Sequence, residues 1–303
     1  MARPIIFVTG STDGIGKATA AELLSRGAEV IIHSRSSKKG QQVQKELKEK
    51  TGREKPDLFI ADLSDLDQIK KMAADVISRH TRLDVLINNA GVFEKTRRLT
   101  PYGLEMTFAV NYLAPFLVTN LLLPLLLKSA PSRIVTVASS AHEDVRNIKW
   151  DNLQGEKHYE AWDSYALSKF ADITFTYTLA RKIKGTRLTA NCLHPGVTNT
   201  KLLKMAFPDY PGISVEDGAR TSMYLALDPE VNGVSGQYFE DQKPIRSSAL
   251  TYDRSVQERL WKVAEDMIYM WICTKGRQNR KDDFWVNPAL GVPKHLKIAT
   301  GRR

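Results

Sequence analysis

A chain of 303 residues with 42% apolar residues can bury a sizeable core, as one large domain or two ordinary ones. Its formal net charge of +10 would suit acidic partners, but eight lysines and arginines lie between Lys275 and Arg303, against two aspartates. More than half of the excess charge therefore sits in a tail without a dense basic block. We expect no nucleic-acid partner and at most peripheral membrane contact through this tail.

Cysteine usage and hydropathy favour the cytoplasm. Cys192 and Cys273 have no CxxC spacing and no neighbouring histidine set, which speaks against a disulfide framework or a metal site. Met1 leads directly into an apolar strand pattern, without the regions of a signal peptide. The longest apolar run, residues 113–127, is 15 residues long and holds two prolines, so we expect it to be too short to span a bilayer.

Short β-branched runs alternate with helical patterns along the chain. The sequence predicts strands at 4–9, 29–34, 57–61, 83–87, 133–138 and 187–193, and helices at 14–26, 37–50, 65–80, 101–128 and 160–184. This alternation is typical of βαβ units. We therefore expect an α/β fold with a Rossmann-type, doubly wound parallel sheet and helices on both faces, in a single domain.

The last quarter of the chain is expected to be an appendage to that domain. No linker-like composition occurs before about residue 240, so the main domain is expected over 1–240. Residues 241–303 would add an amphipathic helix over 255–271 and the basic tail. Trp261, Ile268 and Trp271 on this helix either cap a substrate cleft or pack on the domain, and packing is the favoured interpretation.

A glycine-rich turn, TGSTDGIGK, joins the first expected strand to the first helix. A triphosphate loop needs Gly, four residues and then Gly-Lys with Ser or Thr, but Ser11 and Ala18 stand where its first glycine and its hydroxyl belong. Gly10, Gly14 and Gly16 instead suit a tight turn that brings a pyrophosphate to a helix N-terminus. The turn therefore indicates dinucleotide binding.

Tyr165 and Lys169 lie four residues apart in the helix over 160–184, so both side chains project from one face. A phenol titrates at about pH 10 in water, but an ammonium a few ångströms away favours the phenolate. The pair thus predicts a general acid/base. The spacing alone is common on helix rims, and it gains weight from the glycine turn.

Three segments together resemble the motifs of the short-chain dehydrogenase/reductase family: TGSTDGIG, NNAG at residues 88–91 and YALSK at residues 165–169. The stretch DNLQGEKHYEAWDSYALSKF is most similar to the branch of retinol dehydrogenases and WW-domain-oxidoreductase-like proteins. The resemblance covers about residues 4–240 and implies that 1–240 form the dinucleotide-binding and catalytic domain. It implies cofactor contacts from Gly10, Ser11, Gly14, Ile15, Gly16, Asp62, Leu63, Asn89, Ala90, Gly91, Tyr165, Lys169, Pro195, Gly196, Thr198 and Thr200.

The resemblance also implies a serine that holds the substrate oxygen and an asparagine that completes a proton relay through water to Lys169. Ser139 and Ser140 both stand at the end of the fifth expected strand. Strand register favours Ser139, and the spacing to Tyr165 favours Ser140; we choose Ser139, because a strand fixes geometry more rigidly than a loop. Asn111 matches the family asparagine.

The family commonly forms homodimers through helices that correspond to residues 101–128 and 160–184. A homodimer is therefore one expected assembly. The apolar stripe of the second helix would equally suit internal packing; it consists of Ala166, Phe170, Ile173, Tyr177 and Ala180.

The expected second strand ends in Ser34-Arg35-Ser36 with no carboxylate. An NAD site usually has an acidic residue there, whereas a 2′-phosphate needs a cation. Because Arg35 can fork onto a phosphate, we expect NADP as the cofactor, with Lys17 solvated. Asp13, before the second turn glycine, is the opposing hint.

The substrate is expected to be a lipophilic alcohol, aldehyde or ketone of retinoid, steroid or fatty type. Two segments, 141–163 and 201–214, are expected to wall the cleft. Their apolar residues are Ile148, Trp150, Leu153 and Trp162, and Leu202, Leu203, Met205, Phe207 and Tyr210. Ordinary packing under the two segments is an equally open interpretation of these residues. The alternative function is a catalytically weak NADP-binding sensor or scaffold of the same fold.

Overall fold

The computed structural model describes residues 3–275, and within them the chain forms one eight-stranded sheet. The strands are β1 Ile5–Val8, β2 Glu29–Ser34, β3 Asp57–Ile60, β4 Val85–Asn88, β5 Ser132–Val137, β6 Leu188–Leu193, β7 Tyr238–Glu240 and β8 Lys243–Ile245. Their order is β3-β2-β1-β4-β5-β6-β7-β8, and all are parallel except β8, which returns antiparallel to β7. Because the winding direction reverses between β1 and β4, the sheet is doubly wound, as expected.

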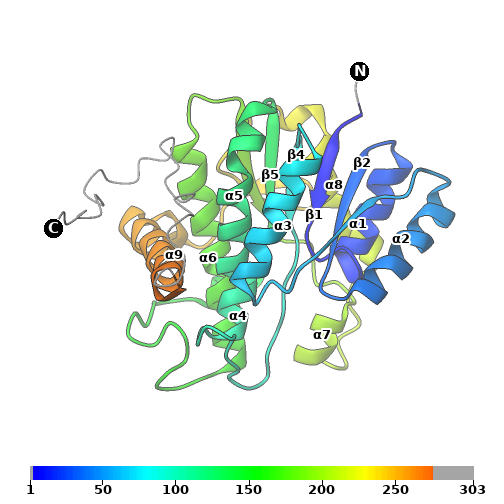
Figure 1. The fold of residues 1–303 in the computed structure, drawn as a ribbon. Helices are drawn as coiled ribbons and strands as arrows, with labels where there is room; N and C mark the ends of the chain where they lie inside the picture. The colour runs from blue at the N-terminus through cyan, green and yellow to red at the C-terminus, as the bar shows by residue number, and fades with distance from the viewer. Residues whose placement is uncertain (1–2, 276–303) are drawn as a thin grey trace.

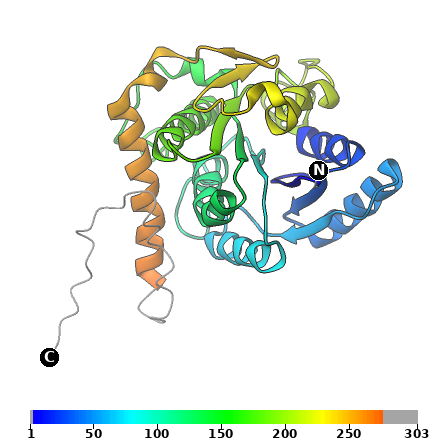
Figure 2. The ribbon, with the colours of Figure 1, turned by 90° about the horizontal axis from the view of Figure 1, so that it is seen from above.

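Helices cover both faces of this sheet (Figures 1 and 2). One layer holds α1 Gly14–Ser25, α2 Ser37–Thr51 and α8 Val215–Leu227, and the other holds α3 Leu66–Arg79, α5 Ala114–Lys128 and α6 Ala161–Lys182. Strand β1 supplies both layers: Ile6 and Val8 join the core on the first side and Phe7 joins the core on the second. Neighbouring residues of a strand face opposite ways, so a buried parallel strand reads as a continuous apolar run.

The shorter elements lie at the ends of strands and helices. They are α4 Met106–Phe108, the π-helix η1 Ala109–Leu113, the 3-10 helices η2 Ser140–Asp144, η3 Pro229–Val231 and η4 Ala249–Tyr252, and α7 Lys201–Ala206. The elements α4, η1 and α5 run on as one helix over residues 106–128, which starts later than the expected residue 101.

This continuous helix is long and apolar enough to cross a membrane by length and composition alone. The expectation that this segment is too short to span a bilayer is therefore wrong about its length. Most of its apolar window is buried inside the fold, and Tyr112, Phe116 and Leu117 are fully buried. Burial in the second layer marks it as a core helix.

Helix α9 Arg254–Lys275 packs beside α6 at the edge of the second layer (Figure 2). The Trp261 ring lies edge-on to Phe116 of α5, with centroids 4.8 Å apart, and stacks on Phe175 of α6 at 5.7 Å. The Tyr112 hydroxyl donates to the backbone oxygen of Leu260 at 2.9 Å. Helix α9 is thus part of the same core.

This arrangement favours packing over cleft-capping for Trp261 and Ile268, both of which are buried. The Trp271 side chain and the basic tail beyond Lys275 lie outside the described residues. The expected boundary at residue 240 falls between β7 and β8, which pair across a two-residue turn. The sequence did not predict α7, α8, β7 and β8, nor the short 3-10 helices η2, η3 and η4.

Candidate active site

A cleft of about 990 Å³ opens at the carboxyl ends of the parallel strands. Its lining includes residues that follow each of the strands β1 to β6, and it lies over the switch point between β1 and β4. In open α/β sheets this is where ligands bind. The turns that follow the strands therefore decide what the cleft can hold.

The glycine turn after β1 is closely packed against the turn after β4. Gly10 adopts φ +64°, and a Cβ there would lie 2.8 Å from Ala90 Cα. A Cβ on Gly16 would lie 2.3 Å from Asn89 Nδ2 and 2.4 Å from Gly10 O. Asn89 Nδ2 donates to the backbone oxygens of Thr9 and Gly10. Only glycine fits at these positions, which leaves the N-terminus of α1 open to an anion.

Ser11 lies beneath this turn and is fully buried. Its Oγ accepts a hydrogen bond from the backbone N–H of His33 at 2.8 Å, so the side chain ties the turn to β2. The prediction that Ser11 contacts cofactor is not supported by this placement, because Ser11 does not line the cleft. Thr12 and Ile15 do line it, and Thr12 was missed.

His33 is a further residue that the sequence did not single out. Its Nδ1 accepts from the Gly10 N–H at 3.0 Å, and its Nε2 lies 2.9 Å from the Ala61 oxygen, which fixes a neutral ring with the proton on Nε2. Burial lowers the pKa of His33 and keeps the ring neutral. The histidine thus joins the ends of β1, β2 and β3 under the cleft.

Two lysines at the mouth of the cleft contact Asp13. Its Oδ1 caps α1 by accepting from the Gly14 N–H, and its Oδ2 pairs with Lys39 at 2.8 Å and Lys201 at 2.7 Å. These lysines hold the pKa of Asp13 below its usual range, although burial opposes them. Arg35 lines the cleft and is exposed, as a 2′-phosphate ligand requires.

Lys17 does not line the cleft and pairs instead with Glu46 of α2 at 2.5 Å. The other expected cofactor residues line it from the strand ends. They are Asp62 and Leu63 after β3, Asn89, Ala90 and Gly91 after β4, and Pro195, Gly196, Thr198 and Thr200 after β6.

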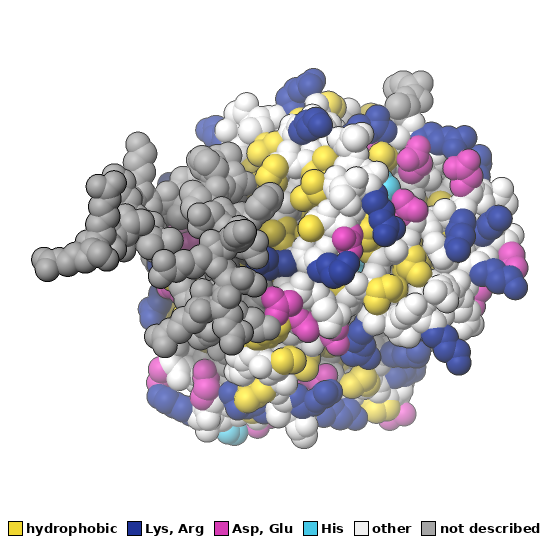
Figure 3. All heavy atoms as spheres, viewed as in Figure 1, with side chains coloured by type: hydrophobic (Ala, Val, Ile, Leu, Met, Phe, Trp, Pro, Cys, Tyr) yellow, Lys and Arg dark blue, Asp and Glu magenta, His cyan; other side chains and the backbone are white. Residues whose placement is uncertain are grey.

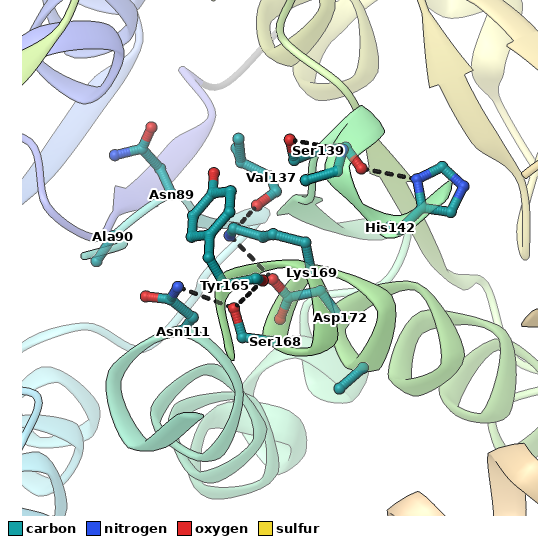
Figure 4. Close-up of polar contacts among 12 residues, drawn as sticks. Asn89, Ala90, Asn111, Val137, Ser139, His142, Tyr165, Ser168, Lys169 and Asp172 are labelled. Atoms are coloured by element: carbon teal, nitrogen blue, oxygen red, sulfur yellow. Dashed lines mark hydrogen bonds and ion pairs between the residues drawn. The ribbon is translucent and has the colours of Figure 1, made fainter. Parts of the chain in front are cut away.

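Tyr165 and Lys169 project from α6 into the middle of the cleft (Figure 4). Tyr165 is held edge-on by Phe93, with ring centroids 5.8 Å apart. Lys169 Nζ donates to the backbone oxygen of Val137, the last residue of β5, at 2.8 Å and lies 6.0 Å from the centre of the Tyr165 ring. The acid/base pair expected from the sequence is therefore assembled in this cleft.

Both candidate serines line the cleft, but their hydroxyls differ. Ser139 Oγ accepts from the Ala141 N–H at 3.2 Å and so caps η2. Ser140 donates its backbone N–H to His194 Nδ1 at 3.2 Å, while its hydroxyl has no hydrogen-bond partner among the described residues. Burial, together with His142, lowers the pKa of His194 to about 4.

The Asn111 side chain points beneath the cleft. Its Oδ1 accepts from the Val92 N–H at 2.8 Å, and its Nδ2 donates to the Val92 oxygen and to Ser168 Oγ, both at 3.0 Å. It makes no direct hydrogen bond to Lys169 and does not line the cleft. The π-helix η1 that carries it is a distortion often found at functional sites.

Only part of the expected apolar wall lines the cleft. Trp162, Leu202, Leu203, Phe207 and Tyr210 do so. The remaining residues lie elsewhere: Ile148 and Leu153 are buried in the core, Trp150 packs on that core under Arg259, and Met205 is exposed outside the cleft. The sequence could not show that residues 145–153 turn away from the cleft.

Comparisons with known proteins agree with this geometry. The family model for short chain dehydrogenases matches residues 4–211, which include β1 to β6 and the Tyr165–Lys169 pair. Retinol dehydrogenase 14 from Mus musculus is 40% identical over 285 residues, covering 87% of this chain and 85% of its own. Polyprenol dehydrogenase from Homo sapiens is 37% identical over 286 residues, covering 87% and 84%.

Solved structures show the same likeness. A short-chain dehydrogenase from Shigella flexneri 2a, solved in complex with NADP, is 30% identical with a TM-score of 0.67 and covers 79% of this chain and 97% of its own. A second one, from Escherichia coli CFT073 in complex with NADPH, is 31% identical with a TM-score of 0.68 and covers 79% and 97%.

Proposed function

Because this chain belongs to the short-chain dehydrogenase/reductase family, we propose that it interconverts a lipophilic alcohol and its aldehyde or ketone with NADP as cofactor. The observation that carries the proposal is the position of Tyr165 and Lys169 in the same cleft that the glycine turn opens into. It is an oxidoreductase that acts on CH–OH and C=O groups.

The residues present fit a dinucleotide. The glycines at 10 and 16 leave no room for a side chain, so a pyrophosphate can approach the N–H groups at the start of α1. Arg35 would take the 2′-phosphate, and Lys169 would hold a ribose hydroxyl. When bound, the nicotinamide supplies or accepts the hydride.

Tyr165 gives a proton to the substrate oxygen during reduction and removes it during oxidation. The ammonium of Lys169 stabilises the phenolate that remains after reduction. Asn111 is expected to contribute to proton supply indirectly, by holding the segment after β4 through Val92.

We propose Ser139, with Ser140 as the alternative, as the donor that holds the substrate oxygen. Ser139 Oγ accepts the Ala141 N–H through a lone pair, so its O–H stays free to donate, and this bond fixes the side chain at the end of β5. The Ser140 hydroxyl has no hydrogen-bond partner among the described residues. The backbone bond from Ser140 to His194 fixes the residue in place. Comparing Ser139→Ala with Ser140→Ala decides the matter, because the larger loss of kcat marks the donor.

The lipophilic substrate is proposed from the apolar wall. Phe207 and Trp162 meet edge-on, with centroids 5.2 Å apart, at the side of the cleft that faces Tyr165. The names of two relatives, retinol and polyprenol dehydrogenase, fit the same class of substrate.

The direct test is NADPH consumption with carbonyls of graded size and polarity, from butanal to decanal and retinal, repeated with NADH. We expect turnover to rise with apolar length and NADPH to be preferred. Turnover only with small charged acids or sugars would contradict the substrate class. NADPH binding without oxidation by any carbonyl would favour the sensor or scaffold alternative.

Assembly and location stay predictions. The stripe Ala166, Phe170, Ile173 and Tyr177 is buried within this chain, as internal packing requires. On the face shown in Figure 3, basic side chains are interspersed with acidic and apolar ones. Liposome binding by the full chain and by a chain ending at Thr274 would test peripheral membrane contact through the tail.

A further inference from the structure

Asp172 is a buried carboxylate that the proposed chemistry does not use. It lies three residues beyond Lys169 and seven beyond Tyr165, so the three side chains share one face of α6. Its Oδ2 accepts a hydrogen bond from Lys169 Nζ at 3.0 Å (Figure 4). The side chains of Lys169 and Asp172 are only 5% and 1% exposed, so water does not screen the pair.

A pair of this kind is an expensive way to stabilise a fold, because two charges lose their hydration. Here the cost is increased by Asp172 Oδ1, which is buried and has no hydrogen-bond partner among the described residues. A well-packed apolar pair would serve stability as well. The location beside the acid/base pair therefore points to a role in the site.

The contacts of Lys169 show what that role is. An ammonium has three N–H donors, and the protein engages two of them, through Val137 O at 2.8 Å and Asp172 Oδ2 at 3.0 Å. These two acceptors, one on β5 and one on α6, fix the position of Nζ. The third donor remains for a ligand in the cleft.

We propose that Asp172 is a positioning residue that holds Lys169 Nζ at the end of β5 and keeps the buried ammonium charged. This rests on the proposed function, in which Lys169 acts on Tyr165 and on a ribose hydroxyl. Without the carboxylate, a buried ammonium favours its neutral form and its stem is free to rotate.

The electrostatics around the pair agree. Burial would lower the pKa of Lys169, but Asp172 and Tyr165 together outweigh burial and raise it. Burial raises the pKa of Asp172, and Lys169 opposes that rise. Two further groups that interact with Asp172 stay neutral at neutral pH, because burial raises the pKa of Tyr112 on η1 and of Cys192 on β6.

The first test is the pH profile of Asp172→Asn. Kinetics of decanal reduction by NADPH between pH 6 and 10 should show the alkaline limb of kcat/KM shifted to lower pH by about one unit. Loss of the negative charge favours proton loss from both Lys169 and Tyr165, so both effects have this sign. Asp163→Asn, the same change at an exposed site of α6, should leave the limb in place. Coincident limbs for wild type and Asp172→Asn would overturn the proposal.

A second test needs no turnover and separates this proposal from the proposed function. Lys169→Met leaves Asp172 unpaired in the core and should lower Tm by about 10 °C. Adding Asp172→Asn should restore part of that loss, because it removes the orphaned charge. A double variant less stable than Lys169→Met alone would overturn the proposal. Absence of turnover in the wild type would contradict the proposed function and leave this result standing.

Discussion

The cofactor side and the substrate side of the cleft are built from different chemical groups. On the cofactor side, backbone turns are locked by buried polar groups, with Asn89 holding Gly10 and His33 joining three strand ends. On the substrate side, the segment around α7 presents large apolar side chains that are half exposed, with Phe207 at 45% and Tyr210 at 51%.

The contrast follows from what each side recognises under the proposed function. The cofactor always presents the same chemical groups. Rigid N–H groups and glycines without side chains can therefore match it before it binds. Side chains that can change rotamer are better able to bind several lipophilic substrates of different shape. Substitutions should therefore have sharp, cofactor-specific effects on one side and graded, substrate-specific effects on the other.

The largest effect is expected at Tyr165, where the two sides meet. Tyr165→Phe should reduce kcat by about 10³-fold or more, because the proton donor is lost, while NADPH affinity stays nearly unchanged. Steady-state NADPH consumption measures kcat, and a fluorescence titration measures the affinity for NADPH. Tyr177→Phe, on the same helix but bonded to Ser247, should retain activity. Equal activity of Tyr165→Phe and wild type would refute the mechanism.

The next effect concerns a property that the two sides share, a buried neutral histidine beneath each. The pKa of His194 is lowered from 6.5 to about 4, so the unfolded chain binds a proton more readily than the folded one between these values. The contribution of His194 to the free energy of unfolding should therefore be fully present above pH 6.5. The free energy of unfolding should decrease as the pH falls toward 4, by about 3 kcal/mol from His194 alone.

Urea denaturation at pH 7.5 and pH 5 measures this loss. His194→Gln should flatten the decrease, whereas His158→Gln, at an exposed site, should leave it unchanged. A free energy of unfolding that does not depend on pH in this range would contradict the neutral histidines.

On the cofactor side, Gly16→Ala should weaken NADPH binding by about 100-fold, because the added methyl group would meet Asn89 and the Gly10 oxygen and displace the turn. Lys17→Ala, one residue along, should bind NADPH normally. Isothermal titration compares the three proteins. Normal affinity in Gly16→Ala would show that this side is less rigid than its contacts indicate.

The smallest effect is expected on the substrate side. Phe207→Ala should raise KM for decanal about fivefold and leave KM for butanal and the affinity for NADPH unchanged, since only a long chain reaches that wall. Met205→Ala, two residues earlier in α7 but outside the cleft, is the matched control. A uniform loss for all aldehydes would mean that α7 is as rigid as the glycine turn.

The same contrast explains what the sequence could predict. The cofactor side depends on local spacing, so the glycines, Asn89 and the i, i+4 pair of Tyr165 and Lys169 could be found from the sequence. His33 could not, because its role comes from three strand ends that only the fold brings together. Asp172 extends the spacing to i+7, and this spacing places it on the same helix face as Tyr165 and Lys169.

On the substrate side, the sequence showed apolar composition but not direction. Ile148 and Leu153 have the same character as Leu202, yet they face the core while Leu202 faces the cleft. The choice between Ser139 and Ser140 likewise depends on which hydroxyl points toward the substrate, and the cap on η2 fixes the direction of Ser139 alone. Such differences depend on chain direction after a strand ends, which no periodicity encodes.

Helix α9 has a consequence for how the protein behaves on dilution. Its Trp261 and Leu260 occupy the outer side of α5 and α6 by contacts within one chain. An intramolecular contact of this kind has the same strength at nanomolar and micromolar protein. The part of the apolar flank of the catalytic helix that α9 covers therefore stays covered however scarce the protein is.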